Sequence, residues 1–146
     1  MSAVVIEQGI VHYEVFGRGH PLVFLHGWLG SWRYWMAAME ELSDHYRAYA
    51  LDLWGFGDSD KTQYRYTVED YTTLLGAFMD TLGIMRAPLV GHALGAAVAL
   101  NFALREPQRV ERIMAVCLPL NRDSFNYRLI ICLLYTSDAA DEGLGV

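Results

Sequence analysis

The sequence predicts an α/β fold in which a largely parallel sheet is covered by helices on both faces. From Pro21 onward, short apolar runs typical of strands alternate with longer amphipathic runs typical of helices. This order is typical of parallel strands joined by crossover helices. Glycine, histidine and aspartate residues follow the predicted strands, and ligands of such sheets bind at the carboxyl ends of the strands. We therefore expect the functional residues to gather at one rim of the sheet.

The N-terminal part of the chain is predicted to form strands and one helix. Residues 1–17 read as strand, and within them residues 9–17 alternate between apolar and polar side chains. Residues 21–27 form a short, continuously apolar run, as expected for a strand buried on both faces. Residues 31–46 carry apolar side chains at helical spacing, and residues 46–57 read as a strand that ends in a glycine loop.

The clearest helix signal lies in residues 67–83. Thr67, with Asp70 three residues later, resembles a capping box, and Gly83 is suited to end the helix. The apolar residues between them fall on one face at helical spacing. The remaining predicted elements are a strand at 87–92, a helix at 94–107 and a strand at 110–120.

The composition indicates a globular domain and argues against several kinds of partner. The chain has 146 residues, of which 53% are hydrophobic and 19% are charged. Its net charge of −6 argues against nucleic acid as the main partner. Two cysteines and an N-terminus without a basic segment give neither a disulfide framework nor a signal peptide, so a reducing cytoplasm is expected. The apolar runs are too short for a bilayer, which needs about 20 residues.

Three segments place distinctive residues at the ends of three successive predicted strands. They read FLHGWLGSW from Phe24, LDLWGFGDSD from Leu51 and LVGHALGAAVAL from Leu89. In their order and spacing these segments resemble the α/β-hydrolase superfamily. Over residues 9–120 the chain looks similar to single-domain ester, lactone and C–C-bond hydrolases that carry a small helical cap. The resemblance implies the N-terminal half of an α/β-hydrolase fold.

The pair His26 and Gly27 follows the first inner strand and allows a sharp turn whose N–H groups point into the rim. The resemblance implies that the backbone N–H of Trp28 and that of Leu94 form an oxyanion hole. Fixed donors of this kind stabilise the charge of a tetrahedral intermediate, by about 2.7–4 kcal/mol for one donor. A simple turn is the alternative interpretation of the pair.

The segment from Gly91 to Gly95 matches the G-x-S-x-G nucleophile elbow except at its centre. Gly91 permits a strained strand-to-helix turn, and Gly95 permits close packing of the helix on a strand. The central residue, at the nucleophile position, is Ala93, which has no hydroxyl group. Leu94 begins the predicted helix, so its N–H is free to bind an anion.

The alanine at position 93 has three interpretations. It is an engineered serine-to-alanine trap, the mark of a pseudo-enzyme, or the native residue of a branch without a serine nucleophile. The sequence GHALG resembles the elbow of aminoacrylate-hydrolase-like members, which favours the third interpretation. Acyl-enzyme chemistry at this position is then excluded. An oxyanion hole and a His-activated water could still act on a labile substrate, since about 10³–10⁴-fold catalysis remains without a triad member.

The other distinctive side chains are expected to support the rim. Asp52 is expected to orient N–H groups of its own loop and to have no catalytic role. His26 and His92 are expected to pack or to form hydrogen bonds. Trp28 and Trp54 are expected in the core, or in the lining of an apolar pocket. The remaining histidines lie in predicted outer segments, without metal-ligand spacing: His12, His20 and His45. We expect no metal, because the histidines and cysteines lack metal-ligand spacing, and no dinucleotide cofactor, because the glycine loop after residue 52 lacks the dinucleotide fingerprint.

After Leu120 the sequence offers no strand that would supply a triad acid or histidine. Residues 1–131 are therefore expected to be a partial α/β-hydrolase core. The segment 132–142 matches the in-frame translation of a transposon-type sequencing adapter, so residues 132–146 are expected to be a non-native tail of environmental sequence data.

The resemblance implies hydrolysis of a small ester-, lactone- or imine-like substrate by the full-length protein, with this chain alone inactive. The alternative is a pseudo-hydrolase that binds a small molecule without catalysis. A dinucleotide-binding domain is disfavoured by the missing fingerprint. The sequence gives no indication of the oligomeric state.

Overall fold

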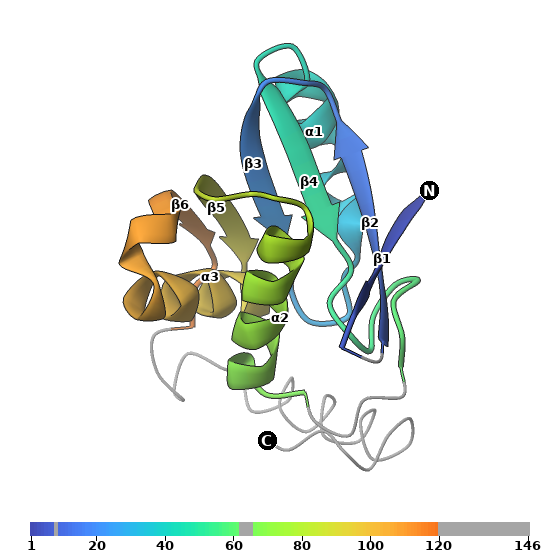
Figure 1. Ribbon diagram of the computed structural model, residues 1–146, viewed down its shortest axis with the longest axis vertical. Coiled ribbons are helices and arrows are strands. Elements are labelled where there is room, and N and C mark those ends of the chain that lie inside the picture. The colour runs from blue at the N-terminus through green and yellow to red at the C-terminus, as the bar shows by residue number, and fades with distance from the viewer. Residues whose placement is uncertain (8, 62–65, 120–146) are drawn as a thin grey trace.

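The computed structural model describes residues 1–7, 9–61 and 66–119, and these form one sheet with helices on both faces (Figure 1). The strands are β1 (Ser2–Ile6), β2 (Gly9–Phe16), β3 (His20–Leu25), β4 (Tyr46–Leu51), β5 (Ala87–His92) and β6 (Val110–Val116). The helices are the 3₁₀ turn η1 (Trp32–Trp35), α1 (Met36–Leu42), α2 (Val68–Thr81), α3 (Leu94–Arg105) and the 3₁₀ turn η2 (Pro107–Arg109). The expectations for residues 120–131 and for the tail at 132–146 lie outside the described residues.

The six strands follow the order β1-β2-β4-β3-β5-β6 across the sheet. Strands β3 to β6 pair in parallel, whereas β1 and β2 form an antiparallel hairpin that joins the sheet at β4. The chain leaves β3 toward β4 and leaves β5 toward β6, in opposite directions. This makes the carboxyl ends of β3 and β5 a topological switch point, where ligands of open α/β sheets bind. The largely parallel sheet predicted from the sequence is confirmed.

Each face of the sheet has its own core, because side chains alternate along every strand. On one face, residues such as Val23 and Leu25 pack with α2 and α3 in the larger cluster. On the other face, Leu22 and Phe24 pack with Trp35 and with Met39 of α1 in the smaller cluster. Figure 1 shows α2 and α3 on one side of the strands and α1 on the other.

Helix α2 begins and ends as its sequence predicts. The hydroxyl of Thr67 accepts the backbone N–H of Asp70, and the carboxylate of Asp70 accepts the backbone N–H of Thr67, which completes the capping box. Gly83 follows the helix with a φ of 68°, the left-handed conformation that glycine adopts without strain.

Three predicted elements are shorter in the structure, each for a local reason. The helix expected at 31–46 starts as the 3₁₀ turn η1, where the Ser31 hydroxyl accepts the N–H of Arg33. The strand expected at 46–57 ends at Leu51, because the next residue, Asp52, bonds to loop N–H groups. The strand expected at 110–120 ends at Val116, and Cys117 turns the chain with a φ of 53°.

Strand β6 is the most exposed strand of the parallel part of the sheet. Within the described residues it pairs with β5, and the side chain of Met114 is 62% exposed. None of the described helices combines the length and the apolar composition that crossing a bilayer requires.

Candidate functional site

The turn between β5 and α3, called the elbow below, has an unusual backbone at Ala93. Ala93 has φ 49° and ψ −109°, a conformation that L residues rarely adopt. Its N–H donates to the carbonyl of Val116 at 2.9 Å, which ties the turn to the end of β6. A Cβ on Gly91 would overlap backbone atoms of Gly95 and Ala96, so the turn can close only around a glycine at this position.

Helix α3 begins directly after this turn and packs against the end of β3. A Cβ on Gly95 would overlap the carbonyl groups of Leu25 and His26, so the absence of a side chain lets the helix approach the strand. Ala93 is the N-cap residue and offers no side-chain hydrogen bond to the helix. The N–H of Leu94, in the first turn, therefore has no partner within the helix and is available to a ligand.

The loop after β3 is fixed at its start by the buried imidazole of His26. Its Nδ1 lies 2.7 Å from the carbonyl oxygen of Gly27, and its Nε2 accepts the backbone N–H of Leu53 at 2.9 Å. Burial lowers the pKa of His26, and this outweighs the raising effects of the Gly27 carbonyl and of Asp52. A neutral imidazole with its proton on Nδ1 fits these contacts. His26 is a hydrogen-bonding residue of the loop, and both of its nitrogens are occupied.

The loop after β3 and the elbow after β5 touch each other. A Cβ on Gly27 would lie 2.6 Å from Nδ1 of His92, so this glycine makes room for the imidazole. The ring of His92 stacks on Tyr34 with a centroid distance of 4.8 Å. Trp28 follows Gly27 and packs edge-on against Phe56 at 5.1 Å. The two residues proposed as oxyanion-hole donors, Trp28 and Leu94, both pack against the larger core cluster.

Asp52 orients loop N–H groups, as predicted. Its carboxylate is fully buried and accepts the N–H of Trp32 on Oδ1 at 2.7 Å and the N–H of Asp58 on Oδ2 at 2.9 Å. It thus joins the loop after β3 to the loop after β4.

His12 lies in β2, next to the edge strand of the sheet, and its buried environment was not predicted from the sequence. Its side chain is only 2% exposed, and Nδ1 lies 2.8 Å from Oδ2 of Asp52. Its backbone N–H donates to the hydroxyl of Ser59, which in turn donates to the carbonyl of Asp52 at 2.6 Å. The sequence signal was weak, because the partners lie 40 residues apart and meet only when β2 pairs with β4.

The spacing of residues in the sequence did not predict a metal site. In the structure, however, three potential metal ligands lie close together around His12. Atoms of His12, Asp52 and Asp58 lie within 4.8 Å of one another. All three side chains already have partners in the described structure: both oxygens of Asp52 accept N–H groups, and Asp58 lies 3.6 Å from Arg33. The cluster is satisfied by hydrogen bonds and ion pairs.

Trp54 lies in the core, which was one of its two predicted places. Its side chain is 5% exposed, and its carbonyl accepts the hydroxyl of Tyr71 at 2.9 Å. The indole N–H groups of Trp28 and Trp54 are buried without a hydrogen-bond partner in the described structure.

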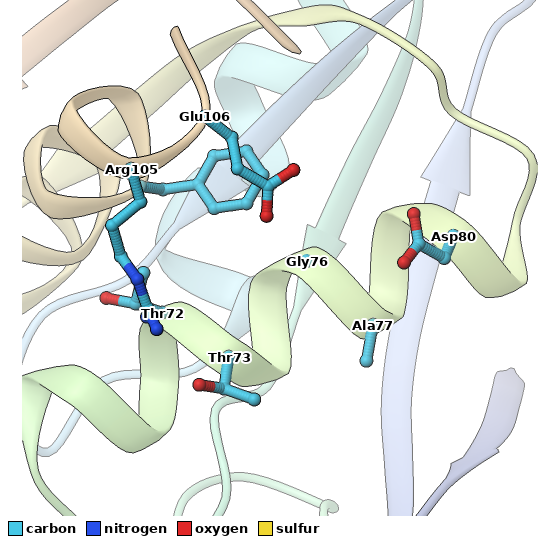
Figure 2. Close-up of a pocket in the computed structure, with 8 residues that line it drawn as sticks. Thr72, Thr73, Gly76, Ala77, Asp80, Arg105 and Glu106 are labelled. Atoms are coloured by element: carbon cyan, nitrogen blue, oxygen red, sulfur yellow. The ribbon is translucent and has the colours of Figure 1, made fainter.

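A solvent-open hollow lies elsewhere, between α2 and α3. It has a volume of about 420 Å³ and opens to solvent (Figure 2). Figure 2 shows Thr72, Gly76 and Asp80 on α2, with Arg105 and Glu106 at the end of α3. It shares no residue with the elbow or with the loop after β3, so it is not the predicted site.

Comparison with known proteins agrees with this arrangement. The sequence profile described as "alpha/beta hydrolase fold" matches residues 20–130. The 2-hydroxy-6-oxo-2,4-heptadienoate hydrolase of Pseudomonas putida is 38% identical over 102 residues, which cover 67% of this chain and 37% of that protein. The chain therefore spans well under half the length of this relative.

Solved structures that share the fold include the following two. A serine-to-alanine variant of the meta-cleavage product hydrolase from Pseudomonas fluorescens IP01, complexed with acetates, superposes with a TM-score of 0.73 at 30% identity over 77% of this chain and 43% of its own. The enol-lactonase from Burkholderia xenovorans LB400 superposes with a TM-score of 0.73 at 27% identity over 77% of this chain and 45% of its own. With its sheet order and the profile match over most of its length, the chain belongs to the α/β-hydrolase fold family.

Proposed function

We propose that this chain is the N-terminal part of a hydrolase that acts on a small ester-, lactone- or imine-like substrate at the carboxyl ends of β3 and β5. One observation carries the proposal: Ala93 keeps φ 49° and ψ −109° although it has no nucleophile to present. A conformation of this kind costs of order 1–3 kcal/mol and is typical of functional sites, where the surrounding structure maintains it.

In the proposed site, the substrate carbonyl oxygen lies between the N–H of Trp28 and the N–H of Leu94. Water is the nucleophile, since the methyl group of Ala93 cannot form an acyl-enzyme. For an ester or lactone, the water oxygen bonds to the carbonyl carbon, the bond to the leaving oxygen breaks, and one water proton ends on that oxygen. For an imine, the water oxygen bonds to the C=N carbon and becomes the carbonyl oxygen of the product, while the C–N bond breaks and both water protons end on the leaving amine nitrogen. His26 is not the proposed base, because both of its nitrogens are occupied. The base would come from a part of the complete protein outside the described residues.

The substrate class is supported by the relatives and by the helix N-terminus at the rim. The Burkholderia relative is an enol-lactonase, and the Pseudomonas fluorescens relative holds acetates in a serine-to-alanine variant. A helix N-terminus and unpaired N–H groups favour a carbonyl or carboxylate oxygen. A small carbonyl compound is therefore the proposed partner, in a reducing cytoplasm and without a cofactor, nucleic acid or membrane.

The missing hydroxyl at residue 93 favours a second candidate function, in which the same rim binds a small molecule without turning it over. This pseudo-hydrolase would keep the oxyanion-hole donors for binding alone. The two candidates differ in whether a base meets the rim in the complete protein.

The test is Ala93→Ser in the complete protein that contains this chain. If a base is in place, hydrolysis of an activated ester should rise and a fluorophosphonate probe should label the new serine. Ala97→Ser, one turn further along α3, is the matched control and should remain unlabelled. If neither the native nor the Ala93→Ser protein hydrolyses esters, lactones or imines, the binding function replaces the hydrolase. A covalent acyl-enzyme at any other residue would contradict the proposed elbow chemistry.

A further inference from the structure

We infer that His12 is a positioning residue: held as an imidazolium between the carboxylates of Asp52 and Glu14, it fixes the loop of residues 26–32 through Asp52. The inference rests on the proposed function, because this loop carries the N–H of Trp28 that would bind the substrate oxygen.

The contacts of the ring with two carboxylates support the inference. Nδ1 of His12 lies 2.8 Å from Oδ2 of Asp52, and Nε2 lies 3.1 Å from Oε1 of Glu14. An ionised carboxylate only accepts hydrogen bonds, so both ring nitrogens must donate, which requires the imidazolium. The ring and Asp52 are almost fully buried, where such a charge-assisted pair is strong.

The charged groups around the ring fit this assignment. Asp58 lies 4.0 Å from Nδ1, and the side chain of Arg33 lies 3.6 Å from Asp58. The N-terminal amino group lies 3.7 Å from Glu14. Three carboxylates thus face one imidazolium, with the two other cations on the outer side of the cluster.

Asp52 links the His12 ring to the loop of residues 26–32. Its Oδ1 accepts the N–H of Trp32 at 2.7 Å, at the far end of the loop. The next residue, Leu53, donates its N–H to His26 at the near end. Two consecutive residues after β4 therefore hold both ends of the segment that contains Trp28. A rotation of the Asp52 carboxylate would release one of the two ends.

The backbone contacts of His12 do not depend on its side chain. Its N–H donates to Ser59 and its carbonyl accepts the N–H of Asp52 at 2.9 Å. A substitution at this position therefore keeps β2 bound to the loop after β4 and changes only what faces the carboxylate.

The experiment compares His12→Leu, His12→Asn and a matched control in the complete protein. Leucine removes both donors, whereas the amide of asparagine keeps one near the position of Nδ1. We expect His12→Leu to lower kcat by roughly 10- to 100-fold with little change in KM, as a small displacement of a catalytic donor does. His12→Asn should restore most of kcat. His20→Asn breaks a pair of the same kind, with Glu111 at 2.7 Å, at the solvent-exposed start of β3 and should leave kcat unchanged.

A second readout is independent of catalysis. ¹⁵N NMR of the complete protein at neutral pH should show both ring nitrogens of His12 protonated, and His12→Leu should shift the backbone amide of Trp32. If the native protein has no hydrolytic activity, the proposed function fails while this readout still decides the role of His12. A bare ring nitrogen, an unmoved Trp32 amide, or a His12→Asn variant that is no better than His12→Leu would overturn the inference.

Discussion

The segments that follow β3 and β5 meet at the same rim but are held by different physical means. The loop after β3 is held by hydrogen bonds from His26 and Asp52 to backbone groups. The elbow after β5 is held by steric fit, because Gly91 and Gly95 let backbone segments approach each other where a Cβ would overlap. The loop should therefore respond gradually to changes of charge and pH, whereas the elbow should tolerate no added atoms at its glycines.

The largest effect is expected from Gly95→Val, which tests whether steric fit holds the elbow. The added side chain would overlap the carbonyl of Leu25, a backbone atom of β3 that cannot move aside. We expect a loss of more than about 4 kcal/mol in the free energy of unfolding, measured by thermal denaturation of the complete protein. The control is Gly83→Ala, which meets no atom within 4 Å and should cost only about 1–2 kcal/mol through its left-handed backbone. Equal losses in the two variants would contradict the steric account.

The second-largest effect tests whether hydrogen bonds hold the loop after β3. Asp52→Asn removes the charge that faces the imidazole of His12 and offers an amide where N–H donors point. Breaking a buried ion pair from one side costs about 3–5 kcal/mol, to be measured by urea denaturation. Asp58→Asn serves as the comparison, because its pair with Arg33 is half exposed and is worth at most about 1 kcal/mol. An Asp52→Asn protein as stable as Asp58→Asn would remove the special role of the buried carboxylate.

The loop should also be sensitive to acid through His26. Its pKa is lowered by burial, so below its ordinary value of 6.5 the unfolded chain binds more protons than the folded one. Stability from this group is present above pH 6.5 and is lost as the pH falls toward the lowered pKa, by at most about 1.4 kcal/mol per pH unit for one proton. Urea denaturation of the complete protein between pH 7 and pH 5 measures this slope. His26→Asn should show a shallower slope, and an unchanged slope would assign the effect to other groups.

The smallest effect concerns the strained residue itself. Ala93→Gly should stabilise the protein by about 1 kcal/mol, because glycine adopts the φ of 49° without steric cost. Ala97→Gly, inside α3, should have the opposite sign and cost about 0.5–1 kcal/mol. Thermal denaturation of both variants gives the comparison, and a destabilised Ala93→Gly would show that the elbow carries no strain.

Local patterns predicted the features that depend on neighbouring residues. The capping box of Thr67 and Asp70 and the elbow from Gly91 to Gly95 are each complete within a few residues, so their spacing was sufficient. The contact between His12 and Asp52 was missed, because it depends on which strands pair and not on spacing. The 3₁₀ turn at Trp32 was also missed, since apolar spacing does not distinguish it from an α-helix.

In the described part of the chain, the contacts given above for the elbow involve backbone atoms and glycines and not the side chain of residue 93. The glycines on either side fit the backbone, and the hydrogen bond to Val116 comes from the main-chain N–H of Ala93. Every alanine codon is one base away from a serine codon. A single base change therefore suffices to replace the methyl group of residue 93 by a hydroxymethyl group while the backbone of the turn stays the same. In evolutionary terms, the backbone of this turn and the side chain that it carries at position 93 can therefore change independently of each other.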